Sequence, residues 1–299
     1  MKKIGDTLSS KMPKFLQDQE QVLQDVLAHP DVANFIVTHQ LDRATIERSL
    51  PKFNQYRQEK ERFISQSSDY LAKGYEPILV MNEGYADVAY RETKELINRQ
   101  QQVEATDRIK LINLPKSYQH ISFSDIDFSD PNRITLLAEL SQFLQAYPNV
   151  QKGIYLYGNM GVGKSFLLAG LARELSVQKG VAVTMLHYPT FVVDVKNAIS
   201  TSSVKEKIDD VKAAPVLILD DIGAETSTSW VRDDVLQVIL QYRMLEELPT
   251  FFTSNYSLED LEKKLAQSKQ GDETWQAKRV LERIRAVANE LHLLGKNRR

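Results

Sequence analysis

A glycine-rich stretch in the second half of the chain has the residue types and the spacing to bind phosphate. Residues 158–165 have the sequence GNMGVGKS, which matches the pattern G-x-x-x-x-G-K-[ST] at every fixed position. In such a loop, backbone N–H groups surround phosphate oxygens, the lysine reaches the β- and γ-phosphates, and the hydroxyl binds Mg²⁺. The residues that we expect at the phosphates are Gly158, Asn159, Met160, Gly161, Val162, Gly163, Lys164 and Ser165, the last also a metal ligand.

The segments on either side of this loop suit a phosphate-binding role. Residues 153–157, GIYLY, predict a strand, and apolar residues at helical spacing predict a helix over 164–178. A loop that leads from a strand into a helix brings the positive end of the helix to the bound anion. This order argues against a chance glycine-rich turn and predicts a nucleoside triphosphate site.

Two carboxylates follow a second apolar strand. Residues 216–219, VLIL, predict a buried strand, and Asp220 and Asp221 come directly after it. In an open α/β sheet ligands bind beyond the carboxyl ends of the strands, so both acids are expected to face the phosphates. We expect Asp220 to bind Mg²⁺, directly or through water, and Asp221 to orient or deprotonate the attacking water.

Small polar residues follow the strand predicted over 249–253. Asn255 is expected to hydrogen-bond the γ-phosphate or the water beside it. The alternative is a local role in starting the next helix, because Ser257 and Asp260 form a capping-box pattern.

Arginines near the end of the sequence offer positive charge to the phosphates. Arg279 and Arg283 are one turn apart on a helix predicted over 273–288, so they share a face. From there one of them can neutralise charge on the γ-phosphate of a neighbouring molecule, and the alternative is a solvated helix face. Arg298 lies in a basic tail that can fold back onto a phosphate.

Strands and helices alternate through the second half of the chain. After a helix predicted over 132–147, helices lie between strands predicted at 153–157, 181–186, 216–219 and 249–253. Alternation with short connections predicts a parallel sheet with helices on both faces. The fold class is therefore α/β.

The first third of the chain has a different pattern. Residues 12–66 predict three or four amphipathic helices. Residues 78–81 and 85–90, joined across Asn82-Glu83-Gly84, predict a β-hairpin. Because no catalytic pattern occurs here, we expect a small, mostly helical docking module.

Length and composition set the broad class of protein. A chain of 299 residues can form two domains, which we place, with a linker, at residues 1–105, 106–130 (linker) and 131–299. The net charge of -2 argues against binding to nucleic acid by bulk charge, and zero cysteines exclude a Cys-ligated zinc. Without a signal peptide or a run of apolar residues long enough to span a bilayer, a cytoplasmic protein with no membrane contact is expected.

Together the motifs resemble the AAA+ replicative-helicase loaders of the DnaC/DnaI type, which are relatives of the initiator DnaA. The resemblance rests on the phosphate loop, on LDDIGAE at 219–225, on TSN at 253–255 and on RVLERI at 279–284. It implies an AAA+ P-loop NTPase domain of three αβα layers, with the phosphate-loop strand central in the sheet, and it implies ATP as the nucleotide.

The resemblance also implies roles for single residues and for the domains. Asn255 would be the first sensor of the nucleotide, Arg279 or Arg283 the finger that acts on a neighbouring subunit, and Arg298 the second sensor. Residues 1–105 would hold the hexameric replicative helicase, and the AAA+ domain would bind single-stranded DNA and self-associate. Some loaders of this type carry zinc in the N-terminal domain. Without cysteine, the hairpin here is expected to be held by apolar packing alone.

The residues themselves offer two places for contact with single-stranded DNA. In the loop 226–230, Trp230 either stacks on a base or anchors the following helix in the core, while Thr228 donates to phosphate, with Arg232 nearby. Lys196 lies on the segment that related proteins use to contact DNA, although by itself it is an ordinary surface lysine.

These observations predict an ATP-dependent loader that places the replicative helicase on single-stranded DNA in replication initiation or restart. Mg²⁺-dependent ATP hydrolysis would time its release. Two alternatives stay open. A transposition-helper ATPase has a very similar AAA+ core and would differ in its N-terminal domain, and a nucleotide-gated adaptor would bind ATP and hardly hydrolyse it.

Overall fold

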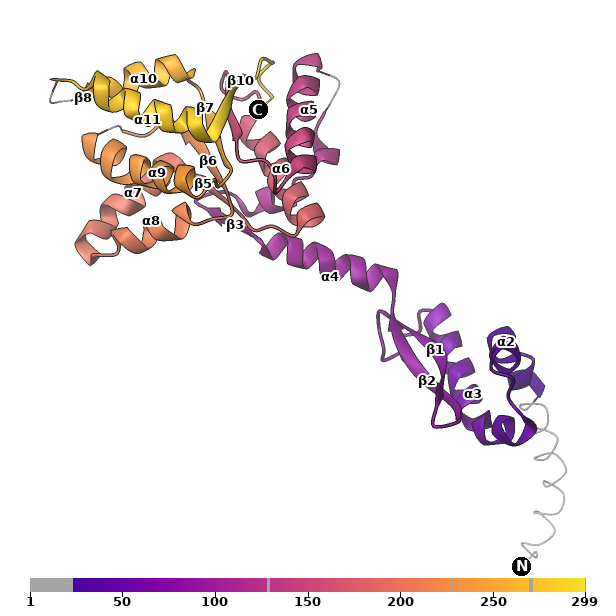
Figure 1. Ribbon diagram of the computed structural model, residues 1–299. Coiled ribbons are helices and arrows are strands. Elements are labelled where there is room, and N and C mark those ends of the chain that lie inside the picture. Colours follow the sequence, from indigo (N-terminus) through magenta and orange to yellow (C-terminus); the bar gives the residue numbers. More distant parts are fainter. Residues whose placement is uncertain (1–23, 128–129, 227, 269–270, 299) are drawn as a thin grey trace, which may run out of the picture. The chain divides into compact units, whose positions relative to one another are not determined.

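The computed structural model describes most of the chain, namely residues 24–127, 130–226, 228–268 and 271–298 (Figure 1). The chain divides into two compact units, residues 1–100 and 101–299. The helices predicted within 12–23 lie outside the described residues. In the described part of the chain, no helix is both long and apolar enough to cross a bilayer.

The first unit consists of helices and a two-stranded hairpin. The Asp42 carboxylate caps the longest helix by accepting a 2.8 Å hydrogen bond from the Thr45 N–H. The hairpin strands pair across Glu83 and Gly84, both with positive φ, as a tight two-residue turn requires, and the predicted hairpin is present. The elements are α2 (Pro30–Thr38), α3 (Arg43–Ile64), β1 (Tyr75–Asn82), β2 (Tyr85–Glu92) and α4 (Lys94–Asp107), which continues past residue 100.

The hairpin packs on α3 through a small core and through polar contacts. Phe53 of α3 is buried together with Ala86 of β2. The buried Ser49 Oγ accepts a 2.9 Å hydrogen bond from the Ala86 N–H, and Lys52 Nζ forms a 2.7 Å ion pair with Asp87. The expectation that apolar packing alone holds the hairpin is therefore wrong, because a buried strand N–H without a ladder partner needs another acceptor.

The second unit is built on a parallel β-sheet, which has six strands in the described part of the chain. The strand order is β10-β4-β7-β6-β5-β3. The phosphate-loop strand β4 is thus second from one edge, which corrects the expectation that it is central, because only β10 pairs with its outer side. The strands are β3 (Ile109–Ile112), β4 (Gly153–Tyr157), β5 (Val183–His187), β6 (Val216–Ile222), β7 (Thr250–Ser254) and β10 (Ala288–His292).

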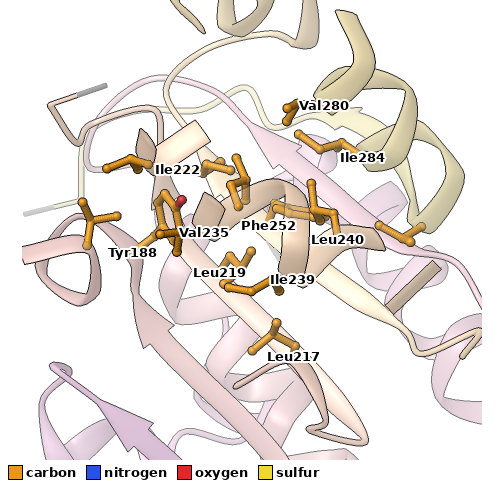
Figure 2. Packing of buried hydrophobic residues seen from close by; sticks show 14 of the residues in the cluster. Tyr188, Leu217, Leu219, Ile222, Val235, Ile239, Leu240, Phe252, Val280 and Ile284 are labelled. Carbon is orange, nitrogen blue, oxygen red and sulfur yellow. The ribbon is translucent and has the colours of Figure 1, made fainter. Parts of the chain in front are cut away.

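Helices cover both faces of this sheet. Successive strand residues point to opposite faces, so Ile218 belongs to one core and Leu217 and Leu219 to the other. Figure 2 shows the second core, in which Leu219 lies near Ile239. The face of Ile218 carries η1 (Lys116–His120), η2 (Phe123–Asp125), α5 (Pro131–Ala146) and α6 (Lys164–Lys179). The face of Leu219 carries α7 (Tyr188–Asn197), α8 (Val204–Lys212), the π-helix η4 (Val231–Leu236), α9 (Gln237–Leu245), α10 (Leu258–Ala266) and α11 (Thr274–Val287). The remaining short elements are η3 (Ala198–Thr201), β8 (Gln267–Ser268) and β9 (Gly271–Asp272).

Two strands of the sheet lie where the sequence predicted other structure. Strand β3 falls in the segment expected as a linker. Four residues are too few for an alternating apolar pattern to be recognised, and these residues form a strand because they pair with β5. Strand β10 begins at Ala288, the predicted last residue of a helix, and pairs with β4. Both are edge strands of the sheet, so a partner far away in the sequence decides their structure.

Candidate active site

A cavity of about 700 Å³ lies at the carboxyl ends of the strands. Part of its wall comes from the phosphate loop and from the ends of β5, β6 and β7, and the rest comes mainly from the chain before β4. The parallel sheet brings these segments together, because the carboxyl ends of all its strands meet at one edge. Of the residues predicted to act on a nucleotide, those that line the cavity are Met160, Gly161, Gly163, Lys164, Ser165, Asp220, Asp221, Asn255 and Arg298.

The phosphate loop turns sharply into helix α6. Gly163, the last residue before the helix, has a φ of +96°, which favours glycine, and a Cβ there would lie 2.9 Å from the Arg133 guanidinium. Because α6 begins at Lys164, the N–H groups of its first turn have no partners within the helix and lie beside the cavity. This arrangement is suited to an anion.

The Lys164 side chain spans the base of the loop. Its Nζ donates to Gly158 O at 2.8 Å, to Asn159 O at 2.9 Å and to Asn255 Oδ1 at 2.9 Å. Gly158 and Asn159 do not line the cavity, and their carbonyl groups instead hold the Lys164 side chain. Val162 is buried in the core. The lysine links the loop after β4 to the end of β7.

Asp220 and Asp221 are tied to the end of the neighbouring strand. Thr253 Oγ1 donates to Asp220 Oδ1 at 2.7 Å and accepts a hydrogen bond from the Asp221 N–H at 2.8 Å. Asn255 Nδ2 donates to Asp221 Oδ1 at 3.0 Å. Since Asn255 contacts both Lys164 and Asp221, it lies between the phosphate loop and the acidic pair.

The environment of Asp220 suits a metal ligand. The residue is 4% exposed, and burial raises the pKa of its carboxyl, while hydrogen bonds from Ser165 and Thr253 oppose that rise. Mg²⁺ binds proteins through one or two carboxylates and otherwise through water and phosphate oxygens, so Asp220 with the Ser165 hydroxyl fits this ion. Among the described residues, no group of three or more His, Cys, Asp or Glu side chains could hold a metal. A cation at Asp220 and Ser165 would take its remaining ligands from water and from phosphate oxygens.

The candidate arginines lie in two places. Arg298 lines the cavity, where its guanidinium pairs with Asp127 at 2.7 Å. Arg279 and Arg283 lie on α11 outside the cavity, and Arg283 Nε donates to Gln241 Oε1 at 2.8 Å. They do not line the cavity of their own chain, so action on a second chain and a solvated helix face both stay predictions.

Two of the residues expected near DNA, Trp230 and Arg232, contact other parts of the same chain. Trp230 is partly buried and packs against the core of Figure 2, which supports its alternative role as a helix anchor. Arg232 is 2% exposed and forms ion pairs with Asp233 and Glu273. The expectation that Arg232 adds to a DNA-binding loop is therefore wrong, because its charge is buried and compensated within the chain.

The remaining candidates for DNA contact lie at helix ends. Thr228 Oγ1 accepts a 3.3 Å hydrogen bond from the Val231 N–H, and Lys196 lies in the last turn of α7. Residue 227, in the same predicted loop, lies outside the described residues. Contact of these residues with DNA stays a prediction. The helix cap proposed as the alternative for the Asn255 segment is present, since Ser257 Oγ accepts from the Asp260 N–H at 3.2 Å.

Several residues of the cavity were given no role from the sequence, and three of them lie beside the candidate residues. His187 ends β5 in register with Asp220, Thr253 bridges the two acids, and Arg133 donates to Val162 O at 2.8 Å. The signal that identified Asp220, a polar residue at the end of an apolar strand, was also available for His187. Arg133 had no such signal, because it comes from a helix that precedes the motif.

Known proteins resemble this chain over both of its units. Residues 1–90 match the family described as primosomal protein DnaI N-terminus, and residues 79–299 match the family of IstB-like ATP binding proteins. Over 310 aligned residues the chain is 36% identical to the replicative helicase loader DnaI of Bacillus subtilis (strain 168), which covers 100% of this chain and 99% of that protein. The chain belongs to the DnaI family.

Two solved structures share the fold of the second half of the chain. A provisionally assigned primosome component from Streptococcus pyogenes serotype M3 is 58% identical with a TM-score of 0.57, over 66% of this chain and 99% of that one. The crystal structure of DnaI is 39% identical with a TM-score of 0.57, over 66% of this chain and 100% of that one. The predicted AAA+ fold class is confirmed, and so is the resemblance to loaders of the DnaC/DnaI type. The family matched by residues 79–299 is described as ATP-binding.

Proposed function

We propose that this DnaI-family protein is an ATP-dependent loader, which places the hexameric replicative DNA helicase on single-stranded DNA in the cytoplasm. The observation that carries the proposal is a single cavity around Lys164, Asp220 and Asn255, in a chain that aligns end to end with a replicative helicase loader. A nucleotide site of this kind can time the release of a partner.

The proposed reaction is phosphoryl transfer from ATP to water. Lys164 and the N–H groups at the start of α6 bind the phosphates, and Ser165 and Asp220 hold Mg²⁺, which when bound neutralises charge on the phosphate oxygens. Asp221 orients the attacking water or accepts its proton, and Asn255 holds that water between the phosphate loop and the acids. Catalysis then comes from positioning and from neutralisation of charge.

The proposed partners follow from the two units. Residues 1–105 hold the helicase, which the match of residues 1–90 to the DnaI N-terminus supports. The AAA+ domain binds single-stranded DNA and self-associates, so that Arg279 or Arg283 acts on a neighbouring nucleotide. The same N-terminal match favours a loader over a transposition helper, because loaders and transposition helpers differ in the N-terminal domain.

Nucleotide binding is tested by Lys164→Ala in the full-length chain. Titration with a fluorescent ATP analogue should show an affinity ~100-fold weaker or more, because the charge that meets the phosphates is lost. Lys179→Ala is the matched control, since Lys179 lies at the other end of α6 and its Nζ lies 3.4 Å from Gln145 O. Unchanged affinity in Lys164→Ala would remove the basis of the proposal.

Loading is tested with the full-length chain and the replicative helicase of the same organism. The two should co-elute in gel filtration, and the wild-type chain with ATP should transfer the helicase to circular single-stranded DNA. Lys164→Ala should still co-elute and fail to transfer. Absence of co-elution would favour the transposition helper, and transfer without single-turnover hydrolysis would favour the nucleotide-gated adaptor.

A further inference from the structure

Residues 293–298 run along the phosphate loop after the last strand. Leu293, which is 1% exposed, donates its N–H to Tyr157 O at 2.8 Å, directly before the loop. The Arg298 N–H donates to Gly161 O at 2.9 Å, within the loop. Two backbone hydrogen bonds therefore attach this segment to the loop at separate points.

Between these two points the segment lies very close to the loop. A Cβ on Gly158 would lie 2.2 Å from Leu293 O, and a Cβ on Gly161 would lie 2.2 Å from Asn297 Oδ1. Gly161 also has a φ of +79°, although the phosphate-binding pattern leaves its position open. The turn and the neighbouring segment thus explain a glycine that the motif does not require.

Two carboxylates hold the far end of the segment. The Arg298 guanidinium lies 2.7 Å from Asp127 Oδ2 and 3.6 Å from Asp130 Oδ2, and both acids come just before α5. Gly295 lies against Asp130 as well, since a Cβ there would be 3.6 Å from its Oδ2. The segment is therefore fixed by the core at Leu293 and by charge at Arg298.

We propose that residues 293–298 are a strap that holds the phosphate loop in its nucleotide-binding conformation, with Asp127 and Asp130 as the positioning residues that fasten it through Arg298. This inference rests on the proposed nucleotide site. Because the strap acts on the loop that holds the phosphates shared by ADP and ATP, it affects both nucleotides equally. A contact from Arg298 to the γ-phosphate alone would affect only ATP.

The test uses Asp127→Asn/Asp130→Asn in the full-length chain. Affinities for fluorescent ADP and ATP should fall by the same factor, roughly 5-fold, since two partly exposed ion pairs are lost. Asn297→Ala should weaken both by a smaller common factor. In the nucleotide-free chain, hydrogen exchange of the amides of residues 158–163 should become faster in both variants, at unchanged thermal midpoint.

Asp125→Asn is the matched control. It removes a negative charge from the same cavity, but the Asp125 Oδ2 accepts a 2.8 Å hydrogen bond from the Ser122 N–H, away from Arg298. The affinities of the Asp125→Asn variant for ADP and ATP should stay equal or improve, because a charge that repels phosphate is gone. The strap is refuted if the double variant leaves affinity and exchange unchanged, or changes ATP affinity alone. If Lys164→Ala also binds normally, the nucleotide site itself is wrong.

Discussion

The two ends of strand β7 each bury a threonine beside a charged side chain, and they use it differently. At the amino end, Thr250 Oγ1 accepts a 2.8 Å hydrogen bond from Arg243 Nε. At the carboxyl end, Thr253 Oγ1 donates to Asp220 at 2.7 Å. Arg243 is fully buried, whereas Asp220 is buried but lines the cavity.

The difference lies in how each charge is compensated. The Arg243 guanidinium also donates to three backbone carbonyls at 2.6 to 2.9 Å, so its donors meet fixed acceptors. Burial works against both charges, since it lowers the pKa of Arg243 to about 9 and raises the pKa of Asp220, but the Asp220 carboxylate has only two hydroxyl donors and a second acid beside it. A buried charge that is satisfied within the chain supports the fold, and one that is left under-compensated at a cavity is available to a ligand.

The largest expected effect is that of Asp220→Asn. Mg²⁺-dependent ATP turnover should fall ~1000-fold, about 4 kcal/mol in the barrier, because the proposed metal ligand is lost. The nucleotide-free chain should become more stable at pH 7, since a poorly compensated buried charge is removed. Steady-state turnover and urea unfolding measure the two effects. A turnover within a few-fold of wild type would place the metal elsewhere.

The next effect is that of Arg243→Ala at the opposite end of the sheet. The free energy of unfolding should fall by about 3 kcal/mol, because buried carbonyls lose their donors. Nucleotide affinity of the folded protein should not change, as Arg243 does not line the cavity. Loss of affinity at a temperature where the variant is folded would show that the two ends are coupled.

A smaller effect is expected from the threonines themselves. Thr253→Val and Thr250→Val each remove one buried hydroxyl, so each should cost about 1–2 kcal/mol of stability. Only Thr253→Val should also reduce ATP turnover, roughly 10-fold, because the two acids lose the group that aligns them. Chemical denaturation and turnover measured in parallel compare the pair. Equal turnover in both variants would remove the functional distinction between the two ends.

The smallest effect is the pH dependence of stability from Asp220. Its folded pKa is raised above the ordinary value of 3.8, so from that pH up to the raised pKa the folded chain holds a proton that the unfolded chain has lost. Stability from this group is therefore present at low pH and is lost as pH rises through that window. Urea unfolding between pH 4 and 7 should show a steeper fall in wild type than in Asp220→Asn. Parallel curves would mean that the carboxyl is well solvated.

Much of the candidate site could be predicted from local sequence. The loop 158–165 and the acids at 220–221 each follow an apolar strand. The apolar residues of these strands can be recognised in the sequence without knowing which strands lie beside them. Residues without a local pattern were missed. His187 and Arg133 reach the cavity because β5 lies beside β6 and α5 lies beside the loop.

The order of residues along the chain was enough to determine that a glycine-rich turn joins a strand to a helix, and that a strand ends in two acids. Each signal comes from one continuous segment of the sequence, where propensity and period operate. Only the tertiary structure decided that β10 and β3 are strands, that β4 is second from an edge, and that residues 293–298 lie on the phosphate loop. These features depend on hydrogen bonds between segments far apart in the sequence, which no local pattern encodes.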